Sequence, residues 1–273
     1  MKTCGPWPIG LCSWSLGRGL AEVSQAMVRL GLSHVHLAVG PATEGRDPGY
    51  VCAVQAQGWS ITATMIDFPQ EDYSTLEQIR RTGGIAPDDC WERNRRIFLE
   101  AVEVTAQLGA KSLSCHLGFI DGTDRAYALK IRDRTAYLAD LAAGRGVTVL
   151  LETGQETAVD LRDFLETLSH PAVAVNLDPA NMILYGKGDP VAAVEVLSPW
   201  IRHVHIKDAV GARQPGTWGT EVRWAEGQVR AGAFLDALRQ SDFHGALAVE
   251  RESGDRRIED IQLALERLAA YGG

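Results

Sequence analysis

Four segments with the composition of buried β-strands each carry, at or near the end, a side chain that can bind a metal ion. The segments read VTVLLE, VAVNLD, IRHVHIKD and ALAVE, and they supply Glu152, Asp178, His205 and Glu250. Three carboxylates and one imidazole form a hard, oxygen-rich set. Such a set suits Mn²⁺, Mg²⁺ or Co²⁺ better than it suits a structural zinc ion, which prefers thiolates and imidazoles. If the four strands lie side by side, these groups converge, and the pattern predicts a metalloenzyme with one divalent ion, Mn²⁺ ahead of Co²⁺, Mg²⁺ or Zn²⁺.

The two glutamates in this set indicate a task beyond holding the ion. A free glutamate has a pKa of about 4.3, which makes it too weak a base to attack a C–H bond unaided. A metal ion that grips a carbonyl and a neighbouring hydroxyl lowers this barrier by stabilising an enediolate. One of Glu152 and Glu250 would then remove a proton beside the carbonyl, and the other would return one on the opposite face. Sugar epimerisation needs this arrangement, whereas a glycoside hydrolase uses two carboxylates without the Asp and His beside them.

The elements that must position these residues alternate between strand-like and helix-like segments along the whole chain. Near-continuous apolar strands suit a parallel sheet covered by helices, and eight strand–helix units predict an α/β fold with a single (β/α)₈ TIM barrel over residues 1–273. A doubly wound open sheet is the alternative, but no GxGxxG or GxxxxGK[ST] follows the first strand. The expected strands span residues 8–14, 33–39, 59–66, 112–119, 147–152, 172–178, 201–208 and 246–250.

Two long connections interrupt this alternation, at 67–87 and at 209–229, and both read as loops. Asp88 or Asp89 is expected to cap the helix that follows the first of them. In a barrel of this kind, the active site lies at the carboxyl ends of the strands. Adjacent strands are about 4.8 Å apart, so side chains from four neighbouring strand ends can reach one ion.

Composition excludes several classes of protein. The chain has 273 residues, 45% of them apolar, and 27 basic against 35 acidic residues give a net charge of −8. Nucleic-acid binding usually needs a basic face, so no nucleic-acid partner is expected. Five scattered cysteines without a CxxC pair are typical of reduced thiols, and no stretch is long enough to span a bilayer. We therefore expect a cytoplasmic protein with no membrane partner.

Four segments carry a resemblance to a known family: LLETGQE, NLDPANMILYGKGDP, IRHVHIKDA and WAEGQVRAGAFLDAL with GALAVERE. They resemble the xylose-isomerase-like superfamily of sugar isomerases and epimerases, most strongly over residues 145–255. The resemblance implies that Glu152 and Glu250 bind the metal and shuttle the proton, and that Asp178 and His205 complete the site. It also implies a small sugar or keto-sugar substrate and pairing into homodimers or homotetramers.

One departure from the family bears on the substrate. The ketose 3-epimerases usually have a substrate-binding histidine three residues after the strand-six aspartate, and this chain has Asn181 there. Their arginine after the strand-seven histidine also lacks a clean match, with Lys207 and Arg213 as candidates. A 3-keto-glycoside therefore fits as well as a free ketohexose.

Further side chains at strand ends are candidates for substrate contact: His116, Asn181, Lys207 and Trp14. His203 shares a strand face with His205 and is expected one layer deeper. Trp218, in the second long connection, is read as part of a lid or of an oligomer contact.

The predicted function is a divalent-metal-dependent sugar or keto-sugar isomerase/epimerase that transfers a proton through a metal-stabilised enediolate. The alternatives are a metal-dependent lyase on 3-keto-glycosides and a non-catalytic carbohydrate-binding barrel. An apurinic-site endonuclease shares the barrel, but it needs a histidine-rich three-zinc cluster, and this acidic chain has only seven histidines.

Overall fold

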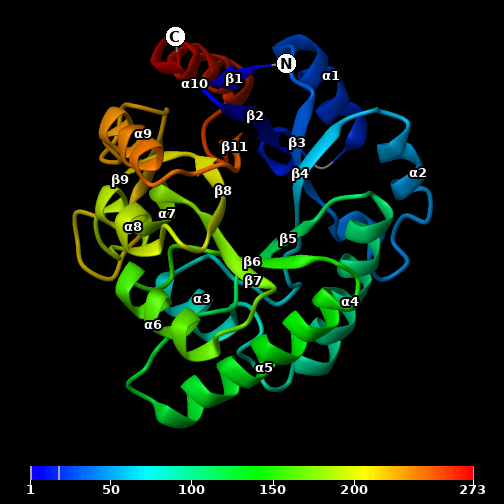
Figure 1. The fold of residues 1–273 in the computed structure, drawn as a ribbon, viewed down its shortest axis with the longest axis vertical. Helices are drawn as coiled ribbons and strands as arrows, with labels where there is room; N and C mark the ends of the chain where they lie inside the picture. The colour runs from blue at the N-terminus through cyan, green and yellow to red at the C-terminus, as the bar shows by residue number, and fades with distance from the viewer. Residues whose placement is uncertain (1, 18, 273) are drawn as a thin grey trace.

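Eight parallel strands close into a ring, as expected for a (β/α)₈ barrel (Figure 1). The computed structural model describes residues 2–17 and 19–272. The ring runs β2-β3-β4-β5-β6-β7-β8-β11, and parallel pairing of β11 with β2 closes it, while the short β1 pairs antiparallel with β2. The bounds are β1 Thr3–Cys4, β2 Trp7–Cys12, β3 His34–Ala38, β4 Ser60–Met65, β5 Ser112–Cys115, β6 Thr148–Glu152, β7 Val173–Leu177, β8 Ile201–Ile206 and β11 Ala246–Val249.

Helices surround the barrel and bury their apolar faces against the outside of the strands (Figure 1). In α4, for example, Phe98, Ala101 and Thr105 recur at helical spacing and are fully buried. The helices are α1 Leu20–Leu30, α2 Tyr50–Gln55, α3 Leu76–Thr82, α4 Trp91–Gln107, α5 Arg125–Ala143, α6 Ala158–Leu168, α7 Pro179–Leu184, α8 Pro190–Leu197, α9 Ala231–Gln240 and α10 Arg257–Gly272.

The period-two geometry of the strands explains why polar residues gather inside the barrel. Along β8, Val204 and Ile206 belong to the large core between strands and helices, so the alternate residues face the interior. The interior is closed on one side by a separate apolar cluster of Ala63, Leu150 and Ala174. Two residues beyond Leu150 lies Glu152, and beyond Ala174 lie Asn176 and then Asp178. Along these strands, every second residue faces the interior, and these residues change from apolar at the Ala63–Leu150–Ala174 cluster to polar toward the carboxyl ends.

Both long connections contain regular structure that the sequence reading did not predict. The connection at 67–87 contains α3, which Thr75 caps by accepting a hydrogen bond from the Gln78 backbone N–H. The connection at 209–229 contains a hairpin of β9 Asp208–Val210 and β10 Thr220–Val222. The expectation that Asp88 or Asp89 caps α4 is wrong: Cys90 holds the N-cap position without a side-chain hydrogen bond, and Asp88 pairs with Lys130 and Arg134.

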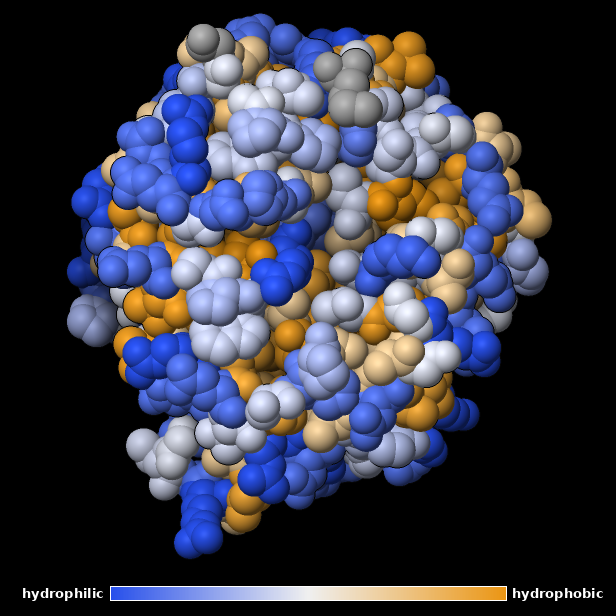
Figure 2. All heavy atoms as spheres, in the orientation of Figure 1, coloured by the Kyte–Doolittle hydropathy of each residue, from blue (hydrophilic) through white to orange (hydrophobic). Residues whose placement is uncertain are grey.

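The surface view in the same orientation shows polar residues over most of this face, with apolar residues around a hollow near its centre (Figure 2). Within residues 2–17 and 19–272, no helix combines the length and the apolar character needed to cross a bilayer.

Asp208 fixes the hairpin beside the carboxyl end of β8. Its buried carboxylate accepts hydrogen bonds from the backbone N–H groups of Ala209, Gly227 and Val229, at 2.8, 3.0 and 3.0 Å. Gly227 approaches so closely that a Cβ there would lie 2.3 Å from Asp208 Oδ1. One side chain thus ties both ends of the connection at 209–229 to the barrel.

We predict that Asp208→Ala lowers the free energy of unfolding by about 2–4 kcal/mol, because it leaves three backbone N–H groups without an acceptor. Urea denaturation followed by circular dichroism measures this change. Asp133→Ala, on the exposed surface of α5, is the matched control and should stay within about 0.5 kcal/mol of the parent. Equal stabilities for the two variants would contradict the anchoring role of Asp208.

Candidate metal centre

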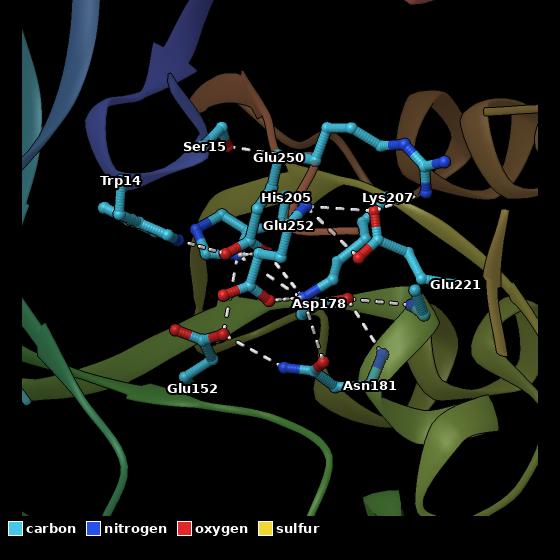
Figure 3. A network of polar contacts seen from close by, with 12 residues as sticks. Trp14, Ser15, Glu152, Asp178, Asn181, His205, Lys207, Glu221, Glu250 and Glu252 are labelled. Atoms are coloured by element: carbon cyan, nitrogen blue, oxygen red, sulfur yellow. Dashed lines mark hydrogen bonds and ion pairs between the residues drawn. The ribbon is translucent and has the colours of Figure 1, made fainter. Parts of the chain in front are cut away.

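The four residues predicted from the strand ends lie together at the carboxyl end of the barrel (Figure 3). Glu152 ends β6, Asp178 directly follows β7, His205 lies in β8, and Glu250 directly follows β11. All four are buried, and one ligand atom of each lies within 4.8 Å of the others. Because β6, β7, β8 and β11 are consecutive neighbours in the ring, the four side chains enter one space from four adjacent strands.

The cluster is organised around one imidazole nitrogen. His205 Nδ1 lies 3.5 Å from Glu152 Oε1, 3.5 Å from Asp178 Oδ2 and 3.2 Å from Glu250 Oε2. The imidazole and the Asp178 carboxylate are completely buried. Three negative groups therefore surround a single nitrogen in a place that water hardly reaches.

The unpaired atoms of this cluster fit a divalent cation. Seven buried side-chain atoms in the described part of the chain have no hydrogen-bond partner, and three of them belong to this cluster: His205 Nδ1, Asp178 Oδ2 and Glu250 Oε2. Buried polar atoms without partners are rare, and these three point at one another. Carboxylate oxygens with one imidazole nitrogen are ligands that Mn²⁺, Mg²⁺ and related ions accept. These residues could therefore hold one metal ion.

The remaining oxygens of two carboxylates are held by neighbouring groups. Asn181 Nδ2 donates to Glu152 Oε1 over 3.1 Å, and Asn176 Nδ2 donates to Glu152 Oε2 over 3.3 Å. Asp178 Oδ1 caps α7 by accepting from the backbone N–H groups of Ala180 and Asn181. Asp178 thus uses one oxygen to start a helix and leaves the other for the cluster.

Two other sequence candidates contact Glu250. The indole N–H of Trp14 donates to Glu250 Oε1. Lys207 is buried, with Nζ 3.0 Å from Glu250 Oε2, 3.7 Å from Asp178 Oδ2 and 2.5 Å from Glu252 Oε2. Lys207 therefore supplies a fixed positive charge on the Glu250 side of the cluster.

The electrostatics keep both glutamates ionised. Burial opposes the charge of Glu250, but Lys207 and His205 outweigh it and hold its pKa well below the ordinary value. Burial also opposes the charge of Glu152, yet His205 and His116 lower its pKa. His116 Nε2 lies 3.8 Å from Glu152 Oε1, and although burial works against a charged imidazole, Glu152 raises the pKa of His116. Two carboxylate anions thus face the cavity across the cluster.

A chain of hydrogen bonds beneath the cluster sets the tautomer of His205. His36 Nε2 lies 3.2 Å from the carbonyl oxygen of Thr64, which can only accept, so Nε2 carries the proton and His36 Nδ1 has a lone pair. That lone pair lies 2.9 Å from His205 Nε2, which must therefore donate. Burial opposes a charge on His205, but the surrounding groups, Glu250 and Glu152 among them, raise its pKa well above the ordinary value, so Nδ1 also carries a proton when no cation is bound. A cation that displaced this proton would meet a lone pair of Nδ1 directed toward the three carboxylates, as a metal ligand requires.

An alternative assignment of these protons is less favourable. Asn176 Nδ2 lies 3.0 Å from His205 Nε2, and donation there would force His36 to carry two protons. Burial and the neighbouring His205 lower the pKa of His36 to about 3, so a doubly protonated His36 is excluded near neutral pH. The Thr64 carbonyl thus places a proton on His36 Nε2, and His36 in turn places one on His205 Nε2.

Some residues of the site were missed by the sequence reading, and others were correctly located. Asn176 precedes Asp178 by two residues, so the spacing that predicted a deeper position for His203 could also have found it. His203 does lie deeper, with Nδ1 2.9 Å from Asn176 Oδ1. Arg213 lies on the exposed hairpin connection and does not line the cavity, whereas Lys207 does.

Glu156, four residues after Glu152 in the chain, is also buried. Burial raises its pKa to about 8, although His116 and Lys187 act in the opposite direction. Glu156 therefore holds a proton near neutral pH and adds no full negative charge to this region.

A comparison of the sequence with known families identifies the family of this chain. A sequence profile described as "Xylose isomerase-like TIM barrel" matches residues 53–271. This chain belongs to the xylose isomerase-like TIM-barrel family. The clustered residues Glu152, Asp178, His205 and Glu250, which could hold a metal ion, all lie inside the matched region.

Solved structures and a curated relative resemble the chain to different degrees. A xylose isomerase domain protein from Planctomyces limnophilus has a TM-score of 0.88 and 29% identity, with 97% of each chain covered. The 3-keto-D-glucoside 4-epimerase from E. coli has a TM-score of 0.73 at 16% identity, over 97% of this chain and 99% of that chain, which shows the shared fold alone. A 3-dehydroshikimate dehydratase from Bacillus anthracis is 37% identical over 84 residues, so the match spans 29% of this chain and only 30% of that protein.

We predict that His36→Leu weakens Mn²⁺ binding by about 10- to 100-fold, because it removes the acceptor that holds the proton on His205 Nε2. His36→Gln should retain most of the affinity, since its amide oxygen can accept from His205 and its amide N–H can donate to Thr64. Isothermal titration calorimetry with Mn²⁺ measures both, and thermal melts verify folding.

The control for these variants is His244→Leu at an exposed position. It should leave Mn²⁺ affinity unchanged. If His36→Leu binds Mn²⁺ as tightly as the parent, the hydrogen bonds from Thr64 through His36 to His205 play no part in metal binding.

Proposed function

We propose that this chain is a divalent-metal-dependent isomerase or epimerase of sugars or keto-sugars. The observation that carries the proposal is the placement of two ionised glutamates, Glu152 and Glu250, on one cluster with Asp178 and His205. In Figure 3, Glu250 enters from the top of the view and Glu152 lies at the bottom. A site built only to hold an ion has no need for glutamates whose second oxygens are oriented by Asn176 and Trp14.

The metal and the protein divide the chemistry between them. A divalent cation held by Glu152, Asp178, His205 and Glu250 would polarise the substrate carbonyl and so acidify the adjacent C–H bond. One glutamate takes the proton from that carbon, and the electron pair of the C–H bond moves toward the carbonyl. The other glutamate, after taking a proton from solvent, delivers it to the same carbon from the opposite face, which inverts the centre. The first glutamate then releases its proton to solvent.

The surrounding residues prepare the glutamates for this transfer. Asn181 and Asn176 fix both oxygens of Glu152, so its carboxylate keeps one orientation toward the cavity. On the other side, Lys207 offsets the charge of Glu250 and can donate a hydrogen bond to a substrate oxygen. Such preorganised donors stabilise charge that develops during reaction without having to reorient.

A second candidate reaction is elimination, and the resemblance to a 3-dehydroshikimate dehydratase favours it. A dehydratase or a lyase on 3-keto-glycosides also begins by removing the proton beside a carbonyl. The electron pair then expels a group from the next carbon in place of reprotonation. The same base serves both reactions, so their products distinguish them.

We predict that the Mn²⁺-loaded protein exchanges a carbon-bound proton of a 3-keto-sugar with deuterium from solvent, and that Glu152→Gln and Glu250→Gln each reduce this rate by about 10²- to 10⁴-fold. Proton NMR in D₂O follows the exchange. Chromatography of the products separates an epimer from an eliminated fragment.

Two controls make the result specific. Glu166→Gln, on the exposed face of α6, should exchange at the parent rate. Metal content is measured for every variant, so that a lost proton acceptor is distinguished from lost metal. Unchanged exchange in both site variants would contradict the proposal.

A further inference from the structure

The cavity above the metal centre is larger than one sugar ring requires. It has a volume of about 1470 Å³, whereas sites for small molecules usually measure about 300–1,000 Å³. Polar groups line the end near the cluster, including Glu152, Asn181 and Lys207. Aromatic side chains line another part, so the two parts differ in the chemistry they offer.

One side of the cavity is an aromatic wall made of Tyr73, Tyr185 and Trp218. Tyr73 comes from the connection after β4, Tyr185 is the C-cap of α7, and Trp218 comes from the β9–β10 connection. The Tyr185 and Trp218 rings pack edge to face, with centroids 4.8 Å apart. Three segments that are distant in the sequence thus form one surface.

Two polar groups of this wall, the Trp218 indole N–H and the Tyr185 hydroxyl, are hydrogen-bonded within the protein. The indole N–H of Trp218 donates to the carbonyl of Tyr73 over 3.1 Å, and Gln155 Nε2 donates to the Tyr185 hydroxyl over 3.4 Å. Behind the wall, a separate apolar cluster of Ile79 and Phe119 packs against Tyr185. These contacts hold Tyr185 and Trp218 in place, and the wall offers ring surface to a ligand.

The wall begins beside the Glu152 side of the metal centre. Asn181, which bonds to Glu152, lies one helical turn before Tyr185, and one turn rises about 5.4 Å. Tyr73 packs on His116, with ring centroids 6.4 Å apart, and His116 Nε2 lies 3.8 Å from Glu152 Oε1. A ligand with one ring at the cluster can therefore reach the wall with a directly linked second ring.

We propose that the aromatic wall binds the second ring of a keto-glycoside, so that the substrate is a glycoside and not a free monosaccharide. This inference rests on the proposed function and names the substrate class for the same site. The flat, apolar face of a ring packs on aromatic side chains, and an aromatic aglycone and a second sugar both present such a face. Free ketohexoses would leave the wall uncovered.

The test compares three 3-keto-β-D-glucoside probes that differ only in the group at the anomeric position: methyl, phenyl and glucosyl. Calorimetry measures their affinities for the Mn²⁺-loaded protein and for Trp218→Ala. We expect at least one two-ring probe to bind about tenfold more tightly than the methyl glycoside. Trp218→Ala should abolish most of this preference and leave methyl glycoside affinity within about threefold. The better of the phenyl and glucosyl probes identifies the kind of second ring.

Two further variants keep the test interpretable. Trp218→Phe retains a ring and should retain most of the preference, which guards against misfolding of the alanine variant. Tyr137→Ala removes an exposed ring on α5, outside the cavity, and should change nothing. Equal affinities of all three probes for the parent protein, or an equal loss for all three in Trp218→Ala, would overturn the proposal.

Deuterium exchange in the same samples separates this inference from the proposed function. A two-ring preference that depends on Trp218, without exchange, supports the subsite and rejects the reaction. Exchange with no preference for two rings supports the reaction and rejects the subsite. Absence of both binding and exchange rejects both.

Discussion

Three carboxylates buried around one imidazole nitrogen impose a constraint on the rest of the structure. Glu152, Asp178 and Glu250 lie within 3.5 Å of His205 Nδ1, where each uncompensated charge costs several kcal/mol. Lys207 offsets part of this charge from one side. A divalent cation would offset the rest and would bind the buried atoms of the cluster that have no hydrogen-bond partner in the described residues. Hydrogen bonds from neighbouring residues hold the three carboxylates in fixed positions around this nitrogen.

The barrel makes this concentration possible through its register. Parallel pairing sets Glu152 opposite Asn176 and His205 opposite Ala248, two residues before Glu250. Residues two apart on each strand therefore form layers: an apolar plug, a neutral hydrogen-bonded layer with His36 and Asn176, and the charged cluster. Hydrogen bonds in the neutral layer fix which ring nitrogens carry a proton. The Thr64 carbonyl accepts from His36 Nε2, and His36 Nδ1 in turn accepts from His205 Nε2.

The sequence was sufficient to predict the barrel and the four clustered side chains, because each lies at or near the end of a strand-like segment and so carries a local signal. The contact between His36 and His205 joins residues 169 positions apart, and periodicity does not report the strand register that creates it. The hairpin on Asp208 was missed for a similar reason, since its bonds span up to 21 positions. Trp218 was assigned to a lid or an oligomer contact, and only the fold places it against Tyr185.

Binding of one metal ion by Glu152, Asp178, His205 and Glu250 would explain both the buried charge and the proposed reaction. Elemental analysis of the purified protein, after incubation with Mn²⁺ and removal of free metal, tests this binding directly. We expect about one metal ion per chain in the parent protein and a large loss in a folded Glu250→Ala variant. A parent protein that retains no metal, or a variant that retains as much as the parent, would contradict it.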